Sequence, residues 1–214
     1  MCISLCLCMC CCMVMRMKVY GVVNVKGGAG KTHAVVHLAR EASHTRRVAV
    51  LDLDPTRQSV NWIELAGLGI PALAFDIKQS DLEAYVTQLR QEADFDVILI
   101  DTPANDRDAA LETLMVSDIA LVPVGVGTSD TGMLGTTERQ IKRAQQMRPA
   151  LKAFILINRA RFAPARERDT VAEAEKTGFP VLNARIPLRG EYQAAAGKVP
   201  VGLHYGEVWK EINK

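Results

Sequence analysis

A short glycine- and lysine-rich stretch, residues 25–32, carries the clearest chemistry in this 214-residue chain. It reads Val-Lys-Gly-Gly-Ala-Gly-Lys-Thr, follows an apolar run at residues 19–24 and precedes a helix-like run at residues 33–41. A strand, a glycine-rich turn and a helix are the context of a phosphate-binding loop, in which backbone N–H groups converge on one anion. We therefore expect Lys31 to reach the β- and γ-phosphates of a nucleotide, and the Thr32 hydroxyl to bind Mg²⁺.

The loop departs from the usual G-x-x-x-x-G-K-[ST] pattern at its first position. Val25 stands where the pattern has glycine, and Lys26 adds a second cation beside Lys31. A chance surface turn rich in glycine and lysine is the alternative interpretation, but the flanking strand and helix favour the loop. The second lysine needs its own explanation, because one lysine already serves the ordinary loop.

Aspartates follow two further apolar runs. The run at residues 95–100 is followed by Asp101, and an earlier run is followed by Asp52 and Asp54. Apolar runs without alternation are typical of strands buried on both faces of a sheet, and ligands bind at the carboxyl ends of such strands. Asp101 is expected to hold a Mg²⁺-bound water opposite Thr32. For Asp52 and Asp54, a plain Asp-Pro turn is the alternative interpretation.

Strand-like and helix-like segments alternate along the chain. The expected strands are residues 19–24, 47–51, 73–77, 95–100, 119–124, 153–157 and 181–186. The expected helices are residues 33–41, 58–66, 80–92, 106–116, 131–147 and 165–176, with a short terminal helix within 194–214. This alternation predicts an α/β fold, with a mostly parallel, twisted sheet covered by helices on both faces.

The composition is typical of one globular domain, which we place at residues 17–214. Hydrophobic residues make up 49% and charged residues 23% of the chain, an ordinary balance for a domain with a full core. The net charge of +2 is too small to indicate nucleic-acid binding by itself, although basic residues outnumber acidic ones at residues 139–189. A DNA-binding face, including Arg139, Lys142 and Arg143 on one helix face, and a solvated surface without a ligand both fit this bias.

All six cysteines lie within residues 2–12. The rest of the sequence therefore has no cysteine for a disulfide framework or a metal cluster. The apolar run at residues 1–15 is too short to span a bilayer as a helix. A lipidated or metal-binding tail is one interpretation, and a wrongly assigned start, with the organised sequence beginning at Met17, is the one we favour. We expect residues 1–16 to be a disordered or wrongly assigned extension.

With the loop and the aspartates in this order, the chain resembles the ParA/MinD-type ATPases, and most of all the short ParF-like partition ATPases. Their K-G-G-x-G-K-T loop matches residues 26–32, and their D-x-D-P-Q-x-S-x-x-N-W segment is similar to residues 52–62. Similar segments also occur at residues 119–124, 128–130, 155–159 and 186–189. Two positions depart from the family pattern: His33 replaces a threonine, and Thr56 replaces a glutamine.

The resemblance implies a three-layer α/β/α P-loop NTPase fold, with ATP and Mg²⁺ as ligands. The implied nucleotide-binding residues are Gly27, Gly28, Ala29, Gly30, Lys31, Thr32, His33 and Asn158, the last of these reading the adenine. The implied metal-site residues are Thr32, Asp52 and Asp101. The implied catalytic residues are Lys26, Lys31 and Asp54. Within this set, Lys26 would complete the partner's site in an ATP-sandwich homodimer, and Asp54 would position the attacking water.

For function, the resemblance implies plasmid or chromosome partition. The ATP-bound dimer would bind DNA without sequence preference, and a ParB- or ParG-like centromere-binding partner would stimulate hydrolysis. Such a protein is expected in the cytoplasm, associated with the nucleoid and not with a membrane. The main alternative is a ParA-like ATPase that positions a protein cargo or the cell-division machinery.

Other members of the superfamily fit the sequence less well. A MinD-type membrane helix is not favoured, because residues 205–214 are short and carry both charges. An iron-protein reductase would need cluster cysteines in the globular part, and a tyrosine kinase of this lineage would need a tyrosine-rich tail. A relative that acts as a small-molecule ligase stays open.

Overall fold

The structure is a computed structural model that describes residues 17–92, 94–127, 134–160, 164–188, 190, 196–199 and 203–214. The expectations for the extension at residues 1–16, for residues 128–130 and for Arg189 lie outside these ranges.

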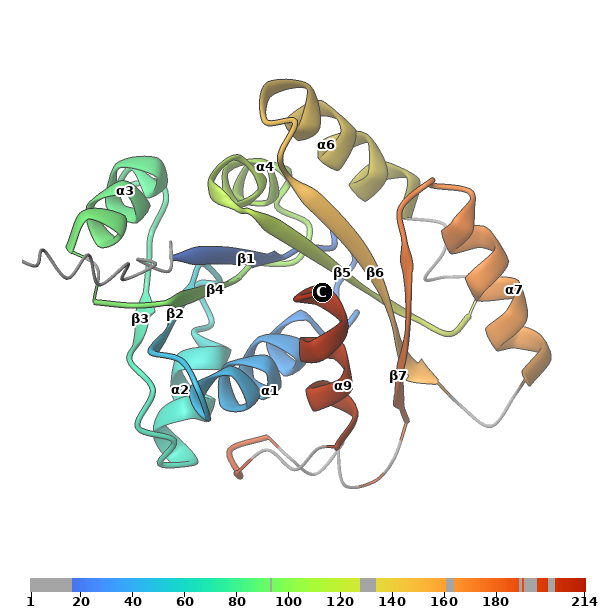
Figure 1. Ribbon diagram of the computed structural model, residues 1–214, viewed down its shortest axis with the longest axis horizontal. Helices are drawn as coiled ribbons and strands as arrows, with labels where there is room; N and C mark the ends of the chain where they lie inside the picture. The colour runs from blue at the N-terminus through green and yellow to red at the C-terminus, as the bar shows by residue number, and fades with distance from the viewer. Residues whose placement is uncertain are drawn as a thin grey trace, which may run out of the picture.

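The described residues form one sheet of seven parallel strands (Figure 1). The strands are β1 (Lys18–Val22), β2 (Val48–Asp52), β3 (Ala72–Ala74), β4 (Val97–Asp101), β5 (Ile119–Gly125), β6 (Lys152–Ala160) and β7 (Val181–Pro187). Their order in the sheet is β3-β2-β4-β1-β5-β6-β7, and every neighbouring pair is parallel. Every residue of β2, β4 and β5 is buried. Burial on both faces explains why their sequences show no polar alternation.

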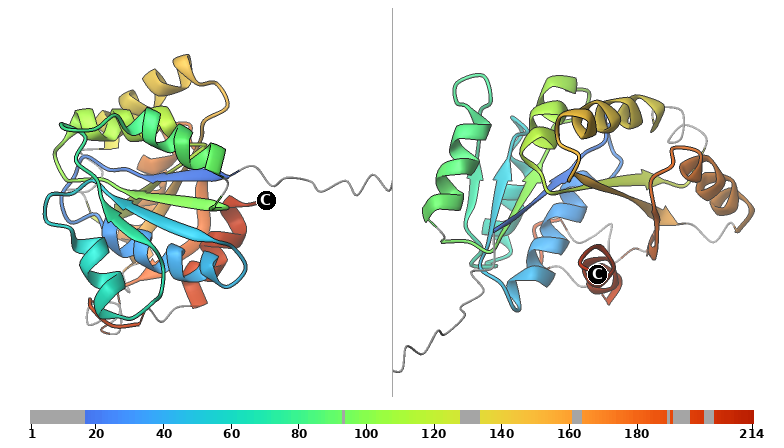
Figure 2. Two further views of the ribbon diagram at one scale, coloured as in Figure 1. Left: turned by 90° about the vertical axis from the view of Figure 1, so that its left-hand side faces the viewer. Right: turned by 45° about the horizontal axis from the view of Figure 1, so that its top comes forward.

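Helices cover both faces of this sheet (Figures 1 and 2). The helices are α1 (Lys31–Ser43), α2 (Gln58–Leu65), α3 (Leu82–Glu92), α4 (Arg107–Val116), α6 (Leu134–Met147), α7 (Pro164–Glu175) and α9 (Leu203–Ile212). One face carries α1, α2 and α9, where Leu38 and Val208 join the same apolar cluster. The opposite face carries α3, α4, α6 and α7, with Ile141 and Ala174 in a second cluster. The expected three-layer α/β/α fold is confirmed.

The strand order brings the candidate site residues to one edge of the sheet. In the register, Val22 at the end of β1 pairs with Asp101 at the end of β4, and Asp52 at the end of β2 pairs with the same residue. The loop after β1 and both aspartates therefore meet at the carboxyl ends of three adjacent strands, where ligands bind in open α/β sheets. None of the described helices is both long enough and apolar enough to cross a membrane.

Gly21 in β1 has no room for a side chain, which gives a test of the packing between β1 and α4. An added Cβ would lie 2.5 Å from Ser117 Oγ and 2.7 Å from Thr113 Cγ2. We expect Gly21→Ala to lower the free energy of unfolding, measured with urea, by about 1–3 kcal/mol, because α4 must shift. The control is Gly135→Ala on α6, where the nearest atom is 3.8 Å away; it should stabilise by about 0.5–1 kcal/mol. Equal effects of the two changes would contradict this packing.

Candidate functional site

Two glycines shape the loop between β1 and α1. Gly28 and Gly30 have φ angles of 72° and 91°, in the left-handed region that glycine adopts without steric cost. Gly30 also lies against Asn158 of β6, so that an added Cβ would be 2.1 Å from the amide nitrogen. Because α1 begins at Lys31, its unpaired N–H groups and the positive end of its dipole lie at this loop. The loop can therefore bind an anion.

Side chains outside the glycines fix the start of the loop. Asn24 accepts a hydrogen bond from the Lys26 N–H at 2.9 Å and donates its amide to the Pro123 carbonyl at 2.8 Å. Val25, which replaces the glycine of the usual pattern, is 3% exposed, and its N–H donates to Thr137 Oγ1 at 3.3 Å. The loop is thus tied to β5 and to α6. The valine side chain is therefore buried at the start of the loop.

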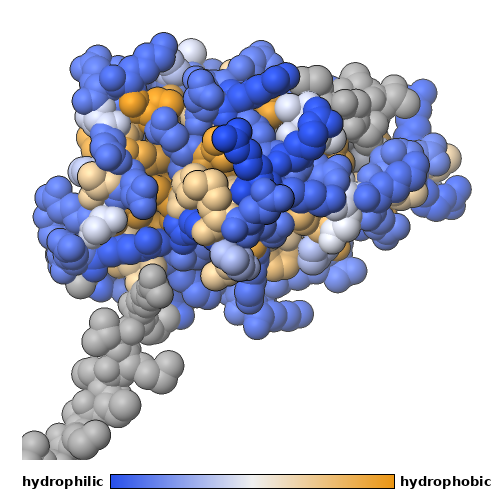
Figure 3. Space-filling view, turned by 90° about the horizontal axis from the view of Figure 1, so that it is seen from above, coloured by the Kyte–Doolittle hydropathy of each residue, from blue (hydrophilic) through white to orange (hydrophobic). Residues whose placement is uncertain are grey.

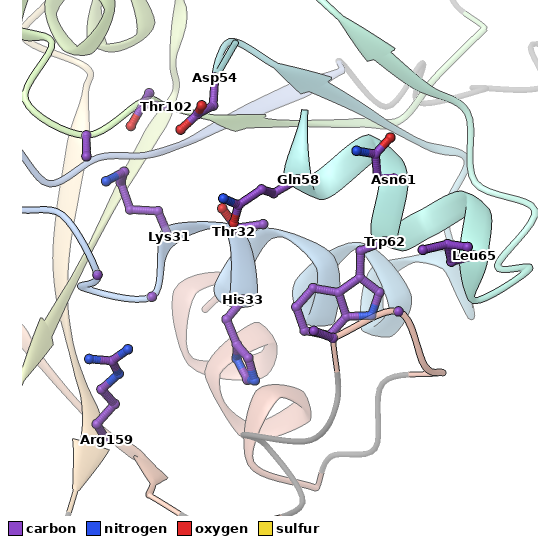
Figure 4. Close-up of a pocket in the computed structure, with 15 residues that line it drawn as sticks. Lys31, Thr32, His33, Asp54, Gln58, Asn61, Trp62, Leu65, Thr102 and Arg159 are labelled. Carbon is purple, nitrogen blue, oxygen red and sulfur yellow. The ribbon is translucent and has the colours of Figure 1, made fainter. Parts of the chain in front are cut away.

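Lys31 is buried at the end of the loop. Its side chain is 6% exposed, and burial lowers its pKa while the charges of Asp101 and Asp54 act in the opposite direction. The ammonium group donates a long hydrogen bond, 3.4 Å, to the Lys26 carbonyl. Figure 4 shows the side chain extending toward Asp54 and Thr102. A phosphate oxygen would be a stronger partner than this carbonyl, since charge-assisted hydrogen bonds are the stronger kind.

Asp101 is a fully buried carboxyl group, 0% exposed. Burial, helped by the charge of Asp52, raises its pKa to about 7, while Thr32 and Lys31 lower it. Neither carboxyl oxygen has a hydrogen-bond partner of ordinary geometry within the described part of the chain. Leaving such a group unpaired is costly, and carboxylate oxygens suit magnesium and its bound water. The position of Asp101 fits a magnesium ion at Thr32.

The protein side chains at this edge do not form a metal site by themselves. In the ranges that the structure describes, no cluster of three or more histidine, cysteine, aspartate or glutamate residues can hold a metal ion. Magnesium usually binds through one or two protein groups together with substrate phosphates and water. The residues therefore fit a magnesium ion that arrives with a nucleotide.

Asp52 has a structural task that the sequence did not predict. Its Oδ2 accepts hydrogen bonds from the Ser59 N–H at 2.9 Å, the Ser59 hydroxyl at 2.6 Å and the Val60 N–H at 3.3 Å. Its Oδ1 accepts one from the Asp54 N–H at 3.0 Å. The carboxylate thus fastens the start of α2 to the end of β2, satisfying helix N–H groups that lack partners within the helix. The predicted magnesium role of Asp52 stays a prediction.

Asp54 lies at the surface of the site, near Lys31. Its Oδ1 accepts hydrogen bonds from the Thr56 N–H at 2.9 Å and the Thr56 hydroxyl at 2.7 Å. The residue that departs from the family's glutamine therefore orients Asp54. Asp54 lines the same cavity as Lys31 (Figure 4). Its predicted role in positioning water stays a prediction.

Two adjoining cavities open beside the loop. The larger, about 640 Å³, extends from Gly28 and Lys31 to Trp62 and Leu65 on α2 (Figure 4). The smaller, about 370 Å³, is lined by Gly30, His33, Trp62, Asn158, Arg159, Ile186, Pro187, Leu188 and Ala196. Both volumes are in the range of small-molecule sites. The larger cavity contains the cationic loop, and the smaller one has several apolar walls.

Asn158 and His33 connect the loop to distant elements. The Asn158 amide donates to the Ala29 carbonyl at 3.0 Å, and its oxygen accepts the Arg159 N–H at 2.8 Å. His33 Nδ1 shares a hydrogen bond of 2.8 Å with the Tyr205 hydroxyl on α9. The predicted contact of Asn158 with adenine and that of His33 with phosphate stay predictions. In the structure, both side chains hold the loop in place.

Sequence reasoning missed three residues that shape the site. Asn24 fixes the loop, Thr102 donates its hydroxyl to the Val22 carbonyl at 2.8 Å, and Arg159 lines both cavities. The signal was present for the first two, because each is a polar residue directly at the end of an apolar strand. Arg159 gives no such signal, since it is one of many basic residues in its half of the chain.

This parallel sheet, with a glycine loop between its first strand and first helix, defines a P-loop nucleotide-binding domain. The sequence model of one protein family, the CobQ/CobB/MinD/ParA nucleotide binding domain, matches residues 20–201. The chain belongs to this family, and the resemblance to ParA/MinD-type ATPases is confirmed.

Similar proteins include relatives with assigned names. "Maintenance of carboxysome distribution protein A" of Halothiobacillus neapolitanus is 26% identical over 81% of this chain and 81% of its own. Apo McdA of Cyanothece superimposes with a TM-score of 0.74 at 15% identity, over 92% of this chain and 98% of its own. Cobyrinic acid a,c-diamide synthase of Mycobacterium smegmatis, with a bound ATP analog and magnesium, superimposes with a TM-score of 0.71 at 22% identity. The superposition covers 92% of this chain and 94% of the synthase chain. These structures share the fold.

The raised pKa of Asp101 predicts a specific pH dependence of stability. Its folded-state value of about 7 exceeds the ordinary 3.8, so the native protein holds this proton more tightly than the unfolded chain. This group therefore lowers stability as the pH rises from about 4 to 7. Without nucleotide, Asp101→Asn should be more stable than the wild type by about 2–4 kcal/mol at pH 8, and the difference should shrink toward pH 4. Urea titrations across this range measure the difference, and a difference independent of pH would contradict the assignment.

Proposed function

We propose that this protein is a magnesium-dependent ATPase whose nucleotide-bound dimer positions a protein cargo in the cell. The observation that carries the ATP part is the burial of Lys31 and Asp101 together at the end of the loop. A bound triphosphate would give Lys31 a charged partner. Magnesium, when bound, neutralises charge on the β- and γ-phosphates.

The remaining residues have roles that follow from their places. The N–H groups of the loop and Lys31 would bind the phosphates, where fixed donors stabilise charge that develops during transfer. Asp54, oriented by Thr56, would hold the water that attacks the γ-phosphate, so that ADP and phosphate leave. The match to a family of nucleotide-binding domains and the bound ATP analog of a similar structure support ATP as the ligand.

Lys26 is the residue that would make hydrolysis depend on a second subunit. Its backbone is fixed by Asn24, and it lies half-buried at the front of the loop, five residues before Lys31. Lys31 would already serve the phosphates in cis. We therefore assign Lys26 to the nucleotide of the partner subunit in a nucleotide-dependent homodimer.

Alanine variants separate the two lysines. Lys31→Ala should abolish ATP binding, because the loop loses its buried cation. Lys26→Ala should bind ATP nearly as well as the wild type, yet lose the ATP-dependent dimer and about 100-fold in hydrolysis rate. Calorimetry, sedimentation and phosphate release measure the three properties. The control is Lys152→Ala, at the opposite end of the sheet. A Lys26→Ala protein that dimerises and hydrolyses normally would contradict the assignment in trans.

For the cargo, the relative named for maintenance of carboxysome distribution favours a protein assembly over DNA. Partition of DNA is the second candidate, and the excess of basic residues in the C-terminal half favours it. Four of these basic residues form ion pairs with carboxylates, which reduces the positive charge available to DNA; they are Lys142, Arg148, Lys176 and Arg185. The surface over α3, α4 and α6 carries mostly hydrophilic side chains, with smaller hydrophobic areas between them (Figure 3).

A cell experiment separates the two cargoes. DNA binding alone does not, because a chromosome can be the cargo or the surface along which a protein cargo is positioned. In a host strain that carries only Lys31→Ala, we expect plasmid and chromosome retention to stay at the wild-type frequency. Proximity labelling with the wild type should identify a protein whose even spacing is lost in that strain. Raised plasmid or chromosome loss, with no protein mislocalised, would support partition of DNA instead.

A further inference from the structure

Arg159, at the end of β6, has a backbone conformation that needs an explanation. Its φ angle is 55°, in the left-handed region that costs free energy for any residue with a side chain. The Asn158 side chain accepts the Arg159 N–H at 2.8 Å, and the pairing of β6 with β7 shifts register between Ile157 and Ala160. Irregularities of this kind re-aim a side chain, and strained residues cluster at functional sites.

The irregular backbone aims Arg159 at the candidate site. The residue lines both the larger and the smaller cavity, and Figure 4 shows its side chain extending from β6 toward the loop. Within the residues that the structure describes, its guanidinium has no ion pair or hydrogen bond. A planar cation therefore stands at the wall that the two cavities share.

The smaller cavity favours a flat, largely apolar ligand group. Ile186, Pro187, Leu188 and Trp62 line it together with Arg159. A guanidinium stacks on aromatic rings better than an ammonium does, because it is planar and more weakly hydrated. The phosphate end already has Lys31 and the loop N–H groups. The neighbouring Asn158 already uses its amide to hold Ala29.

We propose that Arg159 binds the base of the nucleotide, with its guanidinium plane stacked on the purine in the smaller cavity. This inference rests on the proposed nucleotide binding and adds a residue that contacts the base. It assigns the base contact at this end of β6 to Arg159. The left-handed backbone conformation would then serve to direct the Arg159 side chain toward the base.

Calorimetric titration of Arg159→Gln with ATP and with inorganic tripolyphosphate, both with Mg²⁺, tests the proposal. Glutamine has the same backbone cost at this φ angle, so the substitution removes the guanidinium without changing the strain. ATP affinity should fall about tenfold, while tripolyphosphate affinity stays at the wild-type value. Arg159→Lys should recover only part of the loss, because an ammonium does not stack. The matched control is Arg139→Gln, on the exposed face of α6, which should change neither affinity.

The outcomes are distinguishable. Unchanged ATP affinity in Arg159→Gln, at an unchanged melting temperature of the free protein, would overturn the proposal. Equal losses for ATP and tripolyphosphate would overturn base stacking, because they would place the guanidinium on the phosphates. A wild type that binds neither ligand would contradict the proposed function itself, whatever the variants do.

Discussion

The burial of Lys31 together with Asp101 is the constraint on which this site depends. The cost of desolvating two charges can exceed what their attraction returns, especially where hydrogen bonds do not satisfy them. Here the carboxyl group has no hydrogen-bond partner of ordinary geometry among the described residues, and the ammonium has one long bond to its own loop. The protein groups alone therefore leave these two charges incompletely satisfied. A triphosphate with its cation would give both groups charged partners, as the proposed function requires.

The surrounding structure keeps that pair in place. The register sets the end of β1 beside the end of β4, and so sets the loop beside Asp101. Gly30 allows the Asn158 amide to reach the Ala29 carbonyl. Asp52 fastens α2 next to the site. Binding energy then need not be spent on ordering the loop, which is the advantage of a preorganised site.

Much of the fold was predictable because the physical signals are local. Apolar runs without alternation identify strands buried on both faces, and alternation with helices predicts a parallel sheet. The loop and Asp101 could be placed together because the carboxyl ends of parallel strands meet at one edge. Contacts across the chain carry no local signal. Asn158 reaches Ala29 over 129 residues and His33 reaches Tyr205 over 172 residues, so their tasks as supports of the loop could not be read from motifs. The sequence likewise placed Asp52 at the site but did not predict that its carboxylate holds α2.

Calorimetric titration of ATP with Mg²⁺ and without Mg²⁺, into the wild type and Asp101→Asn, tests the central claim most directly. If the buried carboxyl group of Asp101 helps to hold the magnesium ion, the wild type should bind ATP much more tightly with Mg²⁺ than without it. The variant should lose most of that difference while still binding metal-free ATP through Lys31. Equal ATP affinities of the wild type with and without Mg²⁺ would contradict this claim. An effect of Mg²⁺ on the ATP affinity of Asp101→Asn as large as in the wild type would contradict it too.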